Sequence, residues 1–192
     1  MRNKISSKKG FTLIELLIVI AILAILATVV VLVLNPAELL AQARDSQRMS
    51  DLSSIKSAIA LYLATATSPT VETGPTCTAT GCGASPNSPF GSETVTTSTA
   101  VDGNGWVKVN LTGTSGESPL ATLPLDPTNS GSYFYAYKGE NTNKTFELDG
   151  RLESEKYRGL MVTDGGDKNT CTDTYVDANC FYEIGTKAGL TW

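Results

Sequence analysis

A long apolar run near the amino terminus constrains this chain more than any other feature. From Phe11 to Leu34, the only polar residues are Thr12, Glu15 and Thr28. As an α-helix rising about 1.5 Å per residue, this run is roughly 36 Å long, enough to cross the hydrocarbon core of a bilayer. The sequence therefore predicts a membrane-spanning helix here.

The charges that flank the run predict its orientation. The ten residues before it carry four basic side chains, Arg2, Lys4, Lys8 and Lys9. Excess Lys and Arg keep their flank in the cytoplasm, so we expect everything after Leu34 to lie outside it. Without these four, the 15 basic residues of the chain fall to 11 against 19 acidic ones, a net charge of −8. The rest of the chain is therefore strongly acidic, which makes it a poor electrostatic partner for nucleic acid or anionic lipid. We expect no nucleic-acid partner.

A segment of this kind is ordinarily a secretory signal peptide or a single-pass anchor. A signal peptide has a shorter apolar region followed by a cleavage site, and no such site follows this run. A plain anchor does not account for Glu15, because an ionised carboxylate in the membrane costs several kcal/mol unless it has a partner.

A cut between Gly10 and Phe11 would supply that partner. The new α-amino group of Phe11 would be cationic near neutral pH. This amine and Glu15 would both lie in apolar surroundings that penalise either charge alone, so pairing them removes two penalties. If Glu15 of one subunit paired with Phe11 of its neighbour, the pair would also set the axial register of an assembly.

The segment from Lys8 to Leu16, KKGFTLIEL, resembles the prepilin peptidase motif of type IV pilins and of the pseudopilins of type II secretion. The resemblance implies that Gly10 precedes the cut, that Phe11 becomes the N-methylated first residue and that Glu15 sets subunit register. It implies a filament core formed by Leu13 to Leu34 after extraction from the membrane. The implied partners are other copies of the chain, a prepilin peptidase that is also the N-methyltransferase, a filament assembly platform, and the membrane before assembly.

One departure from the family pattern concerns helix breakers. Many members have a glycine and a proline inside the apolar helix, whereas here Pro36 comes only after it. Proline removes a helix hydrogen bond and its ring clashes with the carbonyl four residues earlier, that of Leu32. We therefore expect a kink near Val33 to Pro36.

The next segment, residues 36–65, contains good helix formers and has an amphipathic pattern. Its apolar stripe, at helical spacing, consists of Leu52, Ile55, Ile59, Tyr62 and Leu63. The other faces of the helix receive Arg44, Asp45, Arg48 and Asp51. We expect the stripe to pack on a sheet, and a continuous helix from Phe11 to about Ala64 to be roughly 80 Å long.

The remainder of the chain predicts a loop followed by a small sheet. Residues 66–105 are rich in Thr, Ser, Gly and Pro, which indicates a loop. Apolar and polar residues alternate from Trp106 to Leu111, from Ser132 and from Thr145. The last two runs, separated by GENTNK, predict an antiparallel hairpin, and the first predicts a further strand.

A second resemblance supports this sheet. The run LPLDP, from Leu123 to Pro127 and followed by a tyrosine-rich strand, resembles the entry to the sheet in major pseudopilins and related short bacterial pilins. Physically, Pro124 and Pro127 fix a turn, and Asp126 is placed to bond to nearby backbone amides.

Together these patterns predict an α+β, pilin-like fold. A basic leader, residues 1–10, precedes a membrane or filament-core helix over residues 11–35. The amphipathic helix of residues 36–65 is expected to pack on a small antiparallel sheet within residues 106–192, with the loop of residues 66–105 between them.

Four cysteines in a chain expected to be exported predict disulfides. Three pairings are possible, and the short separations favour Cys77 with Cys82 and Cys171 with Cys180. A zinc site is the alternative, but the chain has no histidine and neither pair has the two-residue spacing of common zinc ligands.

Acidic residues gather around the second cysteine pair and make calcium a candidate cofactor. The candidate ligands are Asp164, Asp167, Asn169 and Asp173. Oxygen ligands at this density suit calcium, and the resemblance to major pseudopilins implies a calcium site in a late loop. The spacing does not fit the EF-hand pattern, and a solvated acidic turn is the alternative interpretation. No cofactor is otherwise required.

The sequence favours assembly over catalysis. It has no histidine, no G-x-S-x-G, no phosphate-binding glycine loop and no C-x-x-C. The resemblance implies a structural subunit of a type IV pilus-like filament used in adhesion, motility or DNA uptake. The alternatives are a major pseudopilin of type II secretion and, in another class, a single-pass membrane-anchored extracytoplasmic binding module. In each case, the chain begins as a cytoplasmic-membrane protein with an extracytoplasmic body, and a filament would be extracellular or periplasmic.

Overall fold

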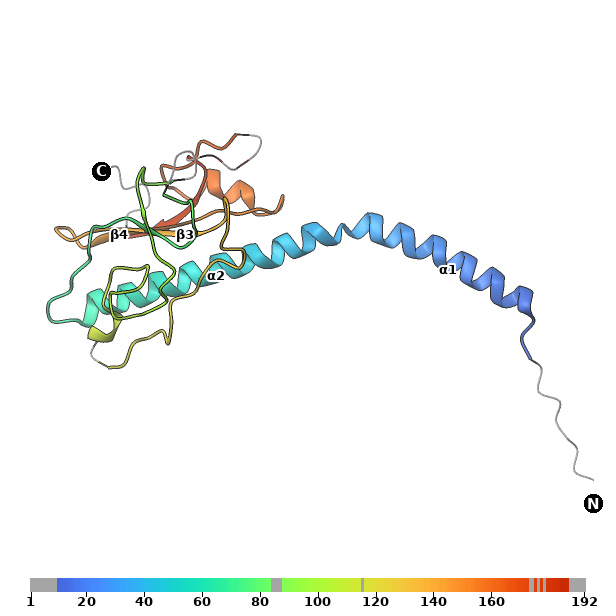
Figure 1. Cartoon of the computed structure of the whole chain (residues 1–192), viewed down its shortest axis with the longest axis horizontal. Helices are drawn as coiled ribbons and strands as arrows, with labels where there is room; N and C mark the ends of the chain where they lie inside the picture. The colour runs from blue at the N-terminus through green and yellow to red at the C-terminus, as the bar shows by residue number, and fades with distance from the viewer. Residues whose placement is uncertain are drawn as a thin grey trace, which may run out of the picture. The chain divides into compact units, whose positions relative to one another are not determined.

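A computed structural model of the chain describes residues 10–83, 88–114, 116–172, 175, 177 and 179–186. These residues form two α-helices, five short strands and two 3-10 turns (Figure 1). The chain divides into two compact units, Met1–Leu39 and Leu40–Trp192.

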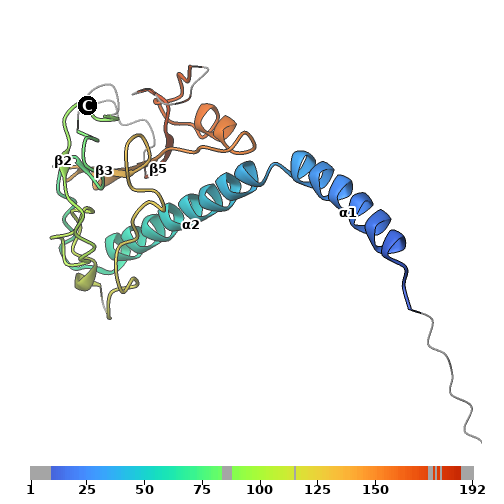
Figure 2. The same cartoon turned by 45° about the vertical axis from the view of Figure 1, so that its right-hand side comes forward.

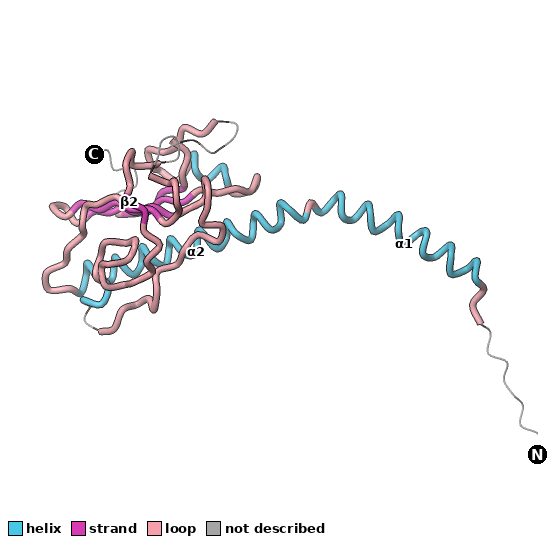
Figure 3. Tube along the Cα trace, viewed as in Figure 1, coloured by secondary structure: helices cyan, strands magenta, loops and turns pink. Residues whose placement is uncertain are grey.

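The apolar run forms helix α1, Leu13–Leu34, as predicted. The helix ends because Asn35 adopts a left-handed backbone conformation, with φ 40° and ψ 73°. Asparagine tolerates this conformation better than most residues, and the following Pro36 has no N–H to continue the hydrogen-bond ladder. Figure 3 shows the loop residue that interrupts the helical trace at this point.

Helix α2, Pro36–Thr65, begins at the proline. Proline suits the first position of a helix, where its missing N–H would have no partner in any case. The predicted continuous helix is therefore wrong, whereas the break falls inside the interval predicted for a kink. Along α2 the predicted stripe is buried at Leu52, Ile55, Ile59 and Tyr62, and Leu63 packs half-buried against it.

The sheet has the order β2-β1-β3-β4-β5. Its strands are β1 Thr76–Cys77, β2 Thr94–Val95, β3 Tyr135–Glu140, β4 Thr145–Gly150 and β5 Tyr182–Gly185. The pairs β1–β3, β3–β4 and β4–β5 are antiparallel, but β1 and β2 are parallel, so the sheet is mixed. Figure 2 shows β2, β3 and β5 together with α2.

The predicted hairpin is confirmed as β3 and β4. Tyr135 lies opposite Gly150 at one end of the pair, and Glu140 opposite Thr145 at the other. The loop predicted for residues 66–105 contains the two shortest strands, β1 and β2. Each consists of two residues, and the two strands pair with each other.

The strand predicted from Trp106 to Leu111 is wrong. This segment consists of bends, makes one isolated bridge between Asp102 and Asn110, and leads into the 3-10 turn η1, Leu111–Gly113. Its apolar residues are nevertheless buried in the main core. The Trp106 indole N–H donates to the carbonyl of Pro124 at 2.9 Å, and the Trp106 backbone amide donates to the carbonyl of Ser98 at 3.0 Å. Side-chain and backbone contacts therefore both hold the segment over the core.

The two faces of the sheet carry different cores. Alternation along β4 sends Phe146 and Leu148 into the main core with α2. On the other face lies a second, smaller core, made of Cys77, Ala79, Cys82, Phe134, Ala136 and Phe181. Glu147 and Asp149 of β4 share this second face and are fully buried there.

Candidate functional site

The peptide bond between Gly10 and Phe11 lies in a non-helical segment ahead of α1. The Phe11 residue is 90% exposed, and a Cβ added at Gly10 would meet no atom within 4 Å. The fold of the chain therefore does not require a glycine at this position. The rest of the predicted leader, residues 1–9, lies outside the described residues.

Glu15 lies in the first turn of α1 and forms a capping box with Thr12. Its Oε2 accepts hydrogen bonds from the Thr12 amide at 2.8 Å and from the Thr12 hydroxyl at 2.6 Å. In return, the Glu15 amide donates to Thr12 Oγ1 at 3.3 Å. This role of Thr12 was not predicted, although a threonine three residues before a glutamate is the usual signature of a capping box.

Apart from Glu15 in its first turn, the surface of α1 is apolar on every side. Leu13–Val31 is, among the described residues, the one helical span long and apolar enough to cross a membrane, and none of it is buried. Thr28 does not interrupt this surface, because its hydroxyl donates to the carbonyl of Ile25 at 2.7 Å. Glu15 is the only charged residue of the helix.

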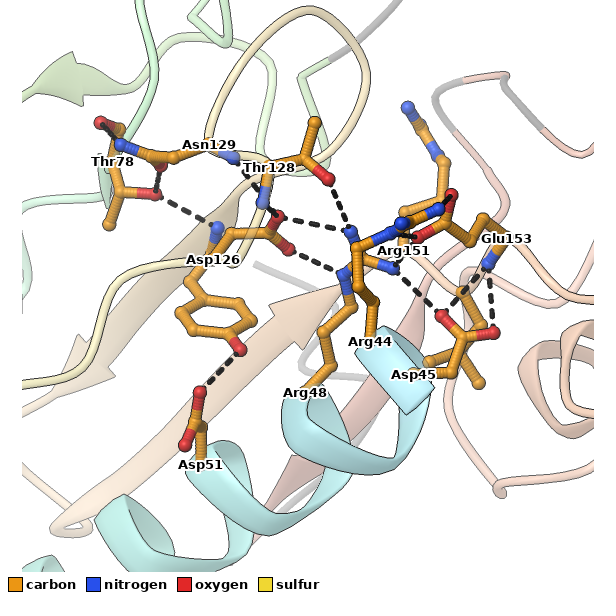
Figure 4. Close-up of polar contacts among 12 residues, drawn as sticks. Arg44, Asp45, Arg48, Asp51, Thr78, Asp126, Thr128, Asn129, Arg151 and Glu153 are labelled. Atoms are coloured by element: carbon orange, nitrogen blue, oxygen red, sulfur yellow. Dashed lines mark hydrogen bonds and ion pairs between the residues drawn. The ribbon is translucent and has the colours of Figure 1, made fainter. Parts of the chain in front are cut away.

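In the second unit, Arg48 of α2 lies at the centre of a buried ionic cluster, with Asp126 on one side and Asp45 on the other (Figure 4). Its Nε and Nη2 donate to the two carboxylate oxygens of Asp126 at 2.7 and 3.1 Å. Its Nη1 donates to Asp45 at 2.8 Å and to Glu153 at 2.7 Å. A bidentate pair of this kind fixes geometry as well as charge.

Glu153 links a second arginine of α2 to the cluster. Arg44 Nε and Nη2 donate to its two carboxylate oxygens at 2.6 and 2.9 Å. Burial alone raises the pKa of Glu153, but the hydrogen bonds from Arg44 and Arg48 outweigh it and hold this pKa below its ordinary value. The carboxylate is therefore kept ionised.

The predicted placement of Asp45 and Arg48 on the other faces of the helix is wrong, since both are fully buried. One sequence signal could have found them. Continued towards the amino terminus, the spacing of the apolar stripe passes from Leu52 through Arg48 and Asp45 to Ala41, which is also buried. Charged residues at core positions indicate partners elsewhere in the chain.

The turn at Asp126 forms as predicted. Its Oδ1 accepts hydrogen bonds from the backbone amides of Thr128 at 2.7 Å and Asn129 at 3.1 Å. The same carboxylate holds Arg48, so one residue connects the entry to the sheet with α2.

The cysteines pair as their separations favour. Cys77 forms a disulfide with Cys82, and Cys171 forms one with Cys180. Beside the second disulfide, the buried Arg151 donates to the carbonyls of Cys180, Ser132 and Asp177. Burial lowers the pKa of Arg151 to about 10, which leaves the guanidinium charged at neutral pH.

Of the four predicted calcium ligands, the three that the structure describes take part in different contacts. The Asp164 carboxylate accepts hydrogen bonds from the backbone amides of Gly166 and Glu183. Asp167 instead belongs to a group of carboxylates with Glu147 and Glu183. The side-chain amide of Asn169 donates to the carbonyl of Gly166, while Asp173 lies outside the described residues.

An unburied apolar helix, followed by a helix packed on a small sheet, defines an α+β, pilin-like fold. Residues 5–31 match the family model of the prokaryotic N-terminal methylation motif. The chain therefore carries the class III prepilin signature of type IV pilins and pseudopilins, which implies a structural subunit and processing by a prepilin peptidase. No curated protein and no solved structure matches the chain.

Proposed function

We propose that this chain is the subunit of a type IV pilus-like filament, cleaved after Gly10, N-methylated at Phe11 and polymerised through α1. The observation that carries the proposal is the surface of α1, which is apolar on all sides and unburied in a single chain. Such a helix is stable in a membrane or against other apolar helices, and its burial in a bundle drives association after extraction.

The surroundings of Gly10 support cleavage at this position. Because a Cβ here would meet nothing within 4 Å, the chain's own fold does not account for the glycine. Recognition by a peptidase accounts for it, since a protease needs close approach to the backbone at the bond it cuts. The exposed, non-helical segment that carries the bond is accessible to such an enzyme.

Glu15 supports the proposed subunit register. Both hydrogen bonds from Thr12 go to Oε2, and Oε1 carries neither of them. A carboxylate can accept several hydrogen bonds, so Glu15 can keep its capping role while Oε1 receives the amine of Phe11 from a neighbouring subunit. Its position in the first turn of α1 places it close to the amino-terminal end of each subunit.

A pseudopilin of type II secretion is the second candidate, favoured by the run from Leu123 to Pro127 that enters the sheet. The two candidates share one assembly mechanism and the same partners: the processing enzyme, an assembly platform, the membrane and further copies of the chain. They differ in whether the filament extends from the cell surface or remains in the periplasm.

Mass spectrometry of the amino terminus of the protein from its native cells tests the proposal. A mature chain that starts at methylated Phe11 is expected. An intact Met1 in the membrane fraction would contradict processing and favour the plain anchor. Electron microscopy of the cell surface then separates long pili from a periplasmic filament.

A further inference from the structure

Three carboxylates are buried side by side on the second face of the sheet. Glu147 and Asp149 alternate along β4 and so share this face, and Glu183 of β5 lies directly opposite Asp149. The relative exposures of the three residues are 0%, 0% and 1%. Burying three ionised carboxylates together is costly unless positive charge lies among them.

The segment before β5 brings a cation to this carboxylate cluster. The Lys168 amide donates to Glu183 Oε2 at 2.7 Å. Gly166 packs so closely on the same carboxylate that a Cβ there would overlap it. The Lys168 ammonium, on a side chain that is 12% exposed, makes an ion pair with Asp167 and lies 4.0 Å from Glu147 Oε1. Backbone and side chain of Lys168 therefore both contact acidic groups here.

A second lysine approaches from the neighbouring strand. Lys138 of β3 lies opposite Glu147 in the β3–β4 pair. Its ammonium is 5.4 Å from the centroid of the Phe90 ring, and that of Lys168 is 5.9 Å from the same centroid. An aromatic face attracts cations, so the ring favours both positions. Glu93, a further carboxylate near Lys138, accepts a hydrogen bond from the Phe90 amide at 2.8 Å.

Protons account for the charge that the lysines leave. Burial, followed by the charges of Glu147 and Glu183, raises the pKa of Asp149 well above its ordinary value. Burial also raises the pKa of Glu183 to about 8, so both carboxyls are mainly protonated at neutral pH. The three carboxylates of the cluster and Asp167 are thus balanced by two protons and two ammonium groups.

Calcium is the cation that the resemblance to major pseudopilins implies, and the oxygens alone have a suitable spacing. One carboxylate oxygen from each of Glu147, Asp167 and Glu183 lies within 4.8 Å of the other two. The donors around these oxygens do not fit the ion. The Lys168 ammonium faces two of the carboxylates, and its amide N–H is directed at the third. Calcium needs oxygen ligands around it and is repelled by an ammonium group among them.

We propose that the Lys168 ammonium takes the place of a metal ion at this cluster, so that the domain folds without calcium. The chain carries this cation on the segment that covers the cluster, and folding of that segment puts the charge in position. The lysine therefore has the role that a bound ion would have, which is to connect the segment before β5 to strands β4 and β5. This inference does not depend on the proposed filament.

Thermal unfolding of the full-length chain in detergent micelles, in calcium chloride or in chelator, tests the proposal. The wild-type melting temperature should differ by less than about 1 °C between the two conditions, because the folded state gains no ligand. A wild-type melting temperature several degrees higher in calcium would overturn the proposal.

Lys168→Met removes the ammonium and keeps most of the side-chain length. In chelator, its melting temperature should fall by about 5 °C or more, because the buried carboxylates lose their counter-charge. Calcium should restore most of this loss and bind at least about tenfold more tightly than to the wild type, since no ammonium competes with it. A gain in calcium binding cannot come from a folding defect. Lys168→Arg keeps the charge and should remain independent of calcium.

Lys156→Met is the matched control, because Lys156 is exposed and lies beside Tyr157, ahead of η2. Its melting temperature should change by less than about 1 °C, as is usual for surface substitutions. An unchanged melting temperature in Lys168→Met, or an equal loss in Lys156→Met, would show that the Lys168 ammonium does not balance the cluster. If calcium fails to stabilise Lys168→Met, the ammonium and an ion do not compete for one place, and the proposal is wrong.

Discussion

Arg48 and Asp126 form a two-point ion pair in which both side chains are completely buried, with donor–acceptor distances of 2.7 and 3.1 Å. This pair joins α2 to the turn that enters the sheet. Removing one partner leaves a buried charge uncompensated, so we expect Arg48→Met to lower the free energy of unfolding by roughly 3–5 kcal/mol. Urea unfolding followed through the fluorescence of the buried Trp106 measures the loss.

An exposed ion pair on the same domain provides the control for this variant. Arg158 and Glu155 lie 4.0 Å apart, and their side chains are 36% and 77% exposed. Glu155→Gln should therefore change the free energy of unfolding by less than about 1 kcal/mol. A similar loss of unfolding free energy in both variants would show that burial does not determine how much the Arg48 ion pair contributes to stability.

The local features of this fold could be predicted from the sequence, because each has a recognisable pattern of apolar and polar residues. The apolar run and the β3–β4 hairpin are of this kind. The burial of Arg48 depends on Asp126 and Glu153, which are 78 and 105 residues away in the chain. No local pattern reports such partners.

The wrong strand prediction at Trp106 to Leu111 and the unpredicted burial of Glu147 and Asp149 in β4 have the same cause. Both depend on contacts with distant parts of the chain. Trp106 to Leu111 has the apolar content of a strand, but its residues enter the core without a partner strand. In β4, alternation correctly puts Glu147 and Asp149 on one face. The polar face of a strand is ordinarily solvated, and nothing local indicates that the segment containing Gly166 and Lys168 covers this one.

Glu147, Asp149 and Glu183 form a buried carboxylate cluster on the second face of the sheet, and this cluster predicts an unusual dependence of stability on pH. Glu183 has a folded-state pKa of about 8 against an ordinary value of 4.5. Because the folded state binds this proton more tightly, its stabilising contribution is complete below about pH 4.5 and is lost as pH rises towards 8. The melting temperature should therefore fall across this interval, and Asp149, whose pKa is raised in the same direction, should add to the fall.

Substitution of the cluster provides the check on this pH dependence. Glu183→Gln removes the titrating group while Glu147, Lys138 and Lys168 remain, so the fall in melting temperature should become shallower. Acid has the opposite effect at Glu153. Because folding lowers the pKa of this carboxyl, its contribution to the stability of the fold is lost as pH falls below about 4.5. An equally steep fall in Glu183→Gln would assign the pH dependence to other groups.

The open surroundings of Gly10 predict that substitution there affects processing alone. In Gly10→Val, the added side chain starts from a Cβ that meets no atom within 4 Å, so the domain should fold with unchanged melting temperature. Cleavage should fall by about tenfold or more, since a β-branched side chain hinders close approach to the backbone. The ratio of uncleaved to mature chain on an immunoblot measures this. Efficient cleavage of Gly10→Val would contradict the assigned junction.

Glu15 has two roles that substitution can separate. Glu15→Ala removes both the capping bonds to Thr12 and the carboxylate proposed to receive the amine of a neighbouring Phe11. Thr12→Ala removes the cap, at a cost of about 1 kcal/mol to the helix, but keeps the carboxylate. Electron microscopy and a shearing assay should therefore find no filaments from Glu15→Ala and substantial filaments from Thr12→Ala.

Both variants should still be exported and folded, because α1 lies in a different compact unit from the cores. Proteolysis of spheroplasts and formation of the two disulfides check this. If Thr12→Ala also fails to polymerise, capping of α1 is the requirement. Abundant normal filaments from Glu15→Ala would instead exclude the carboxylate as the group that sets register, since no other charged residue of α1 could replace it.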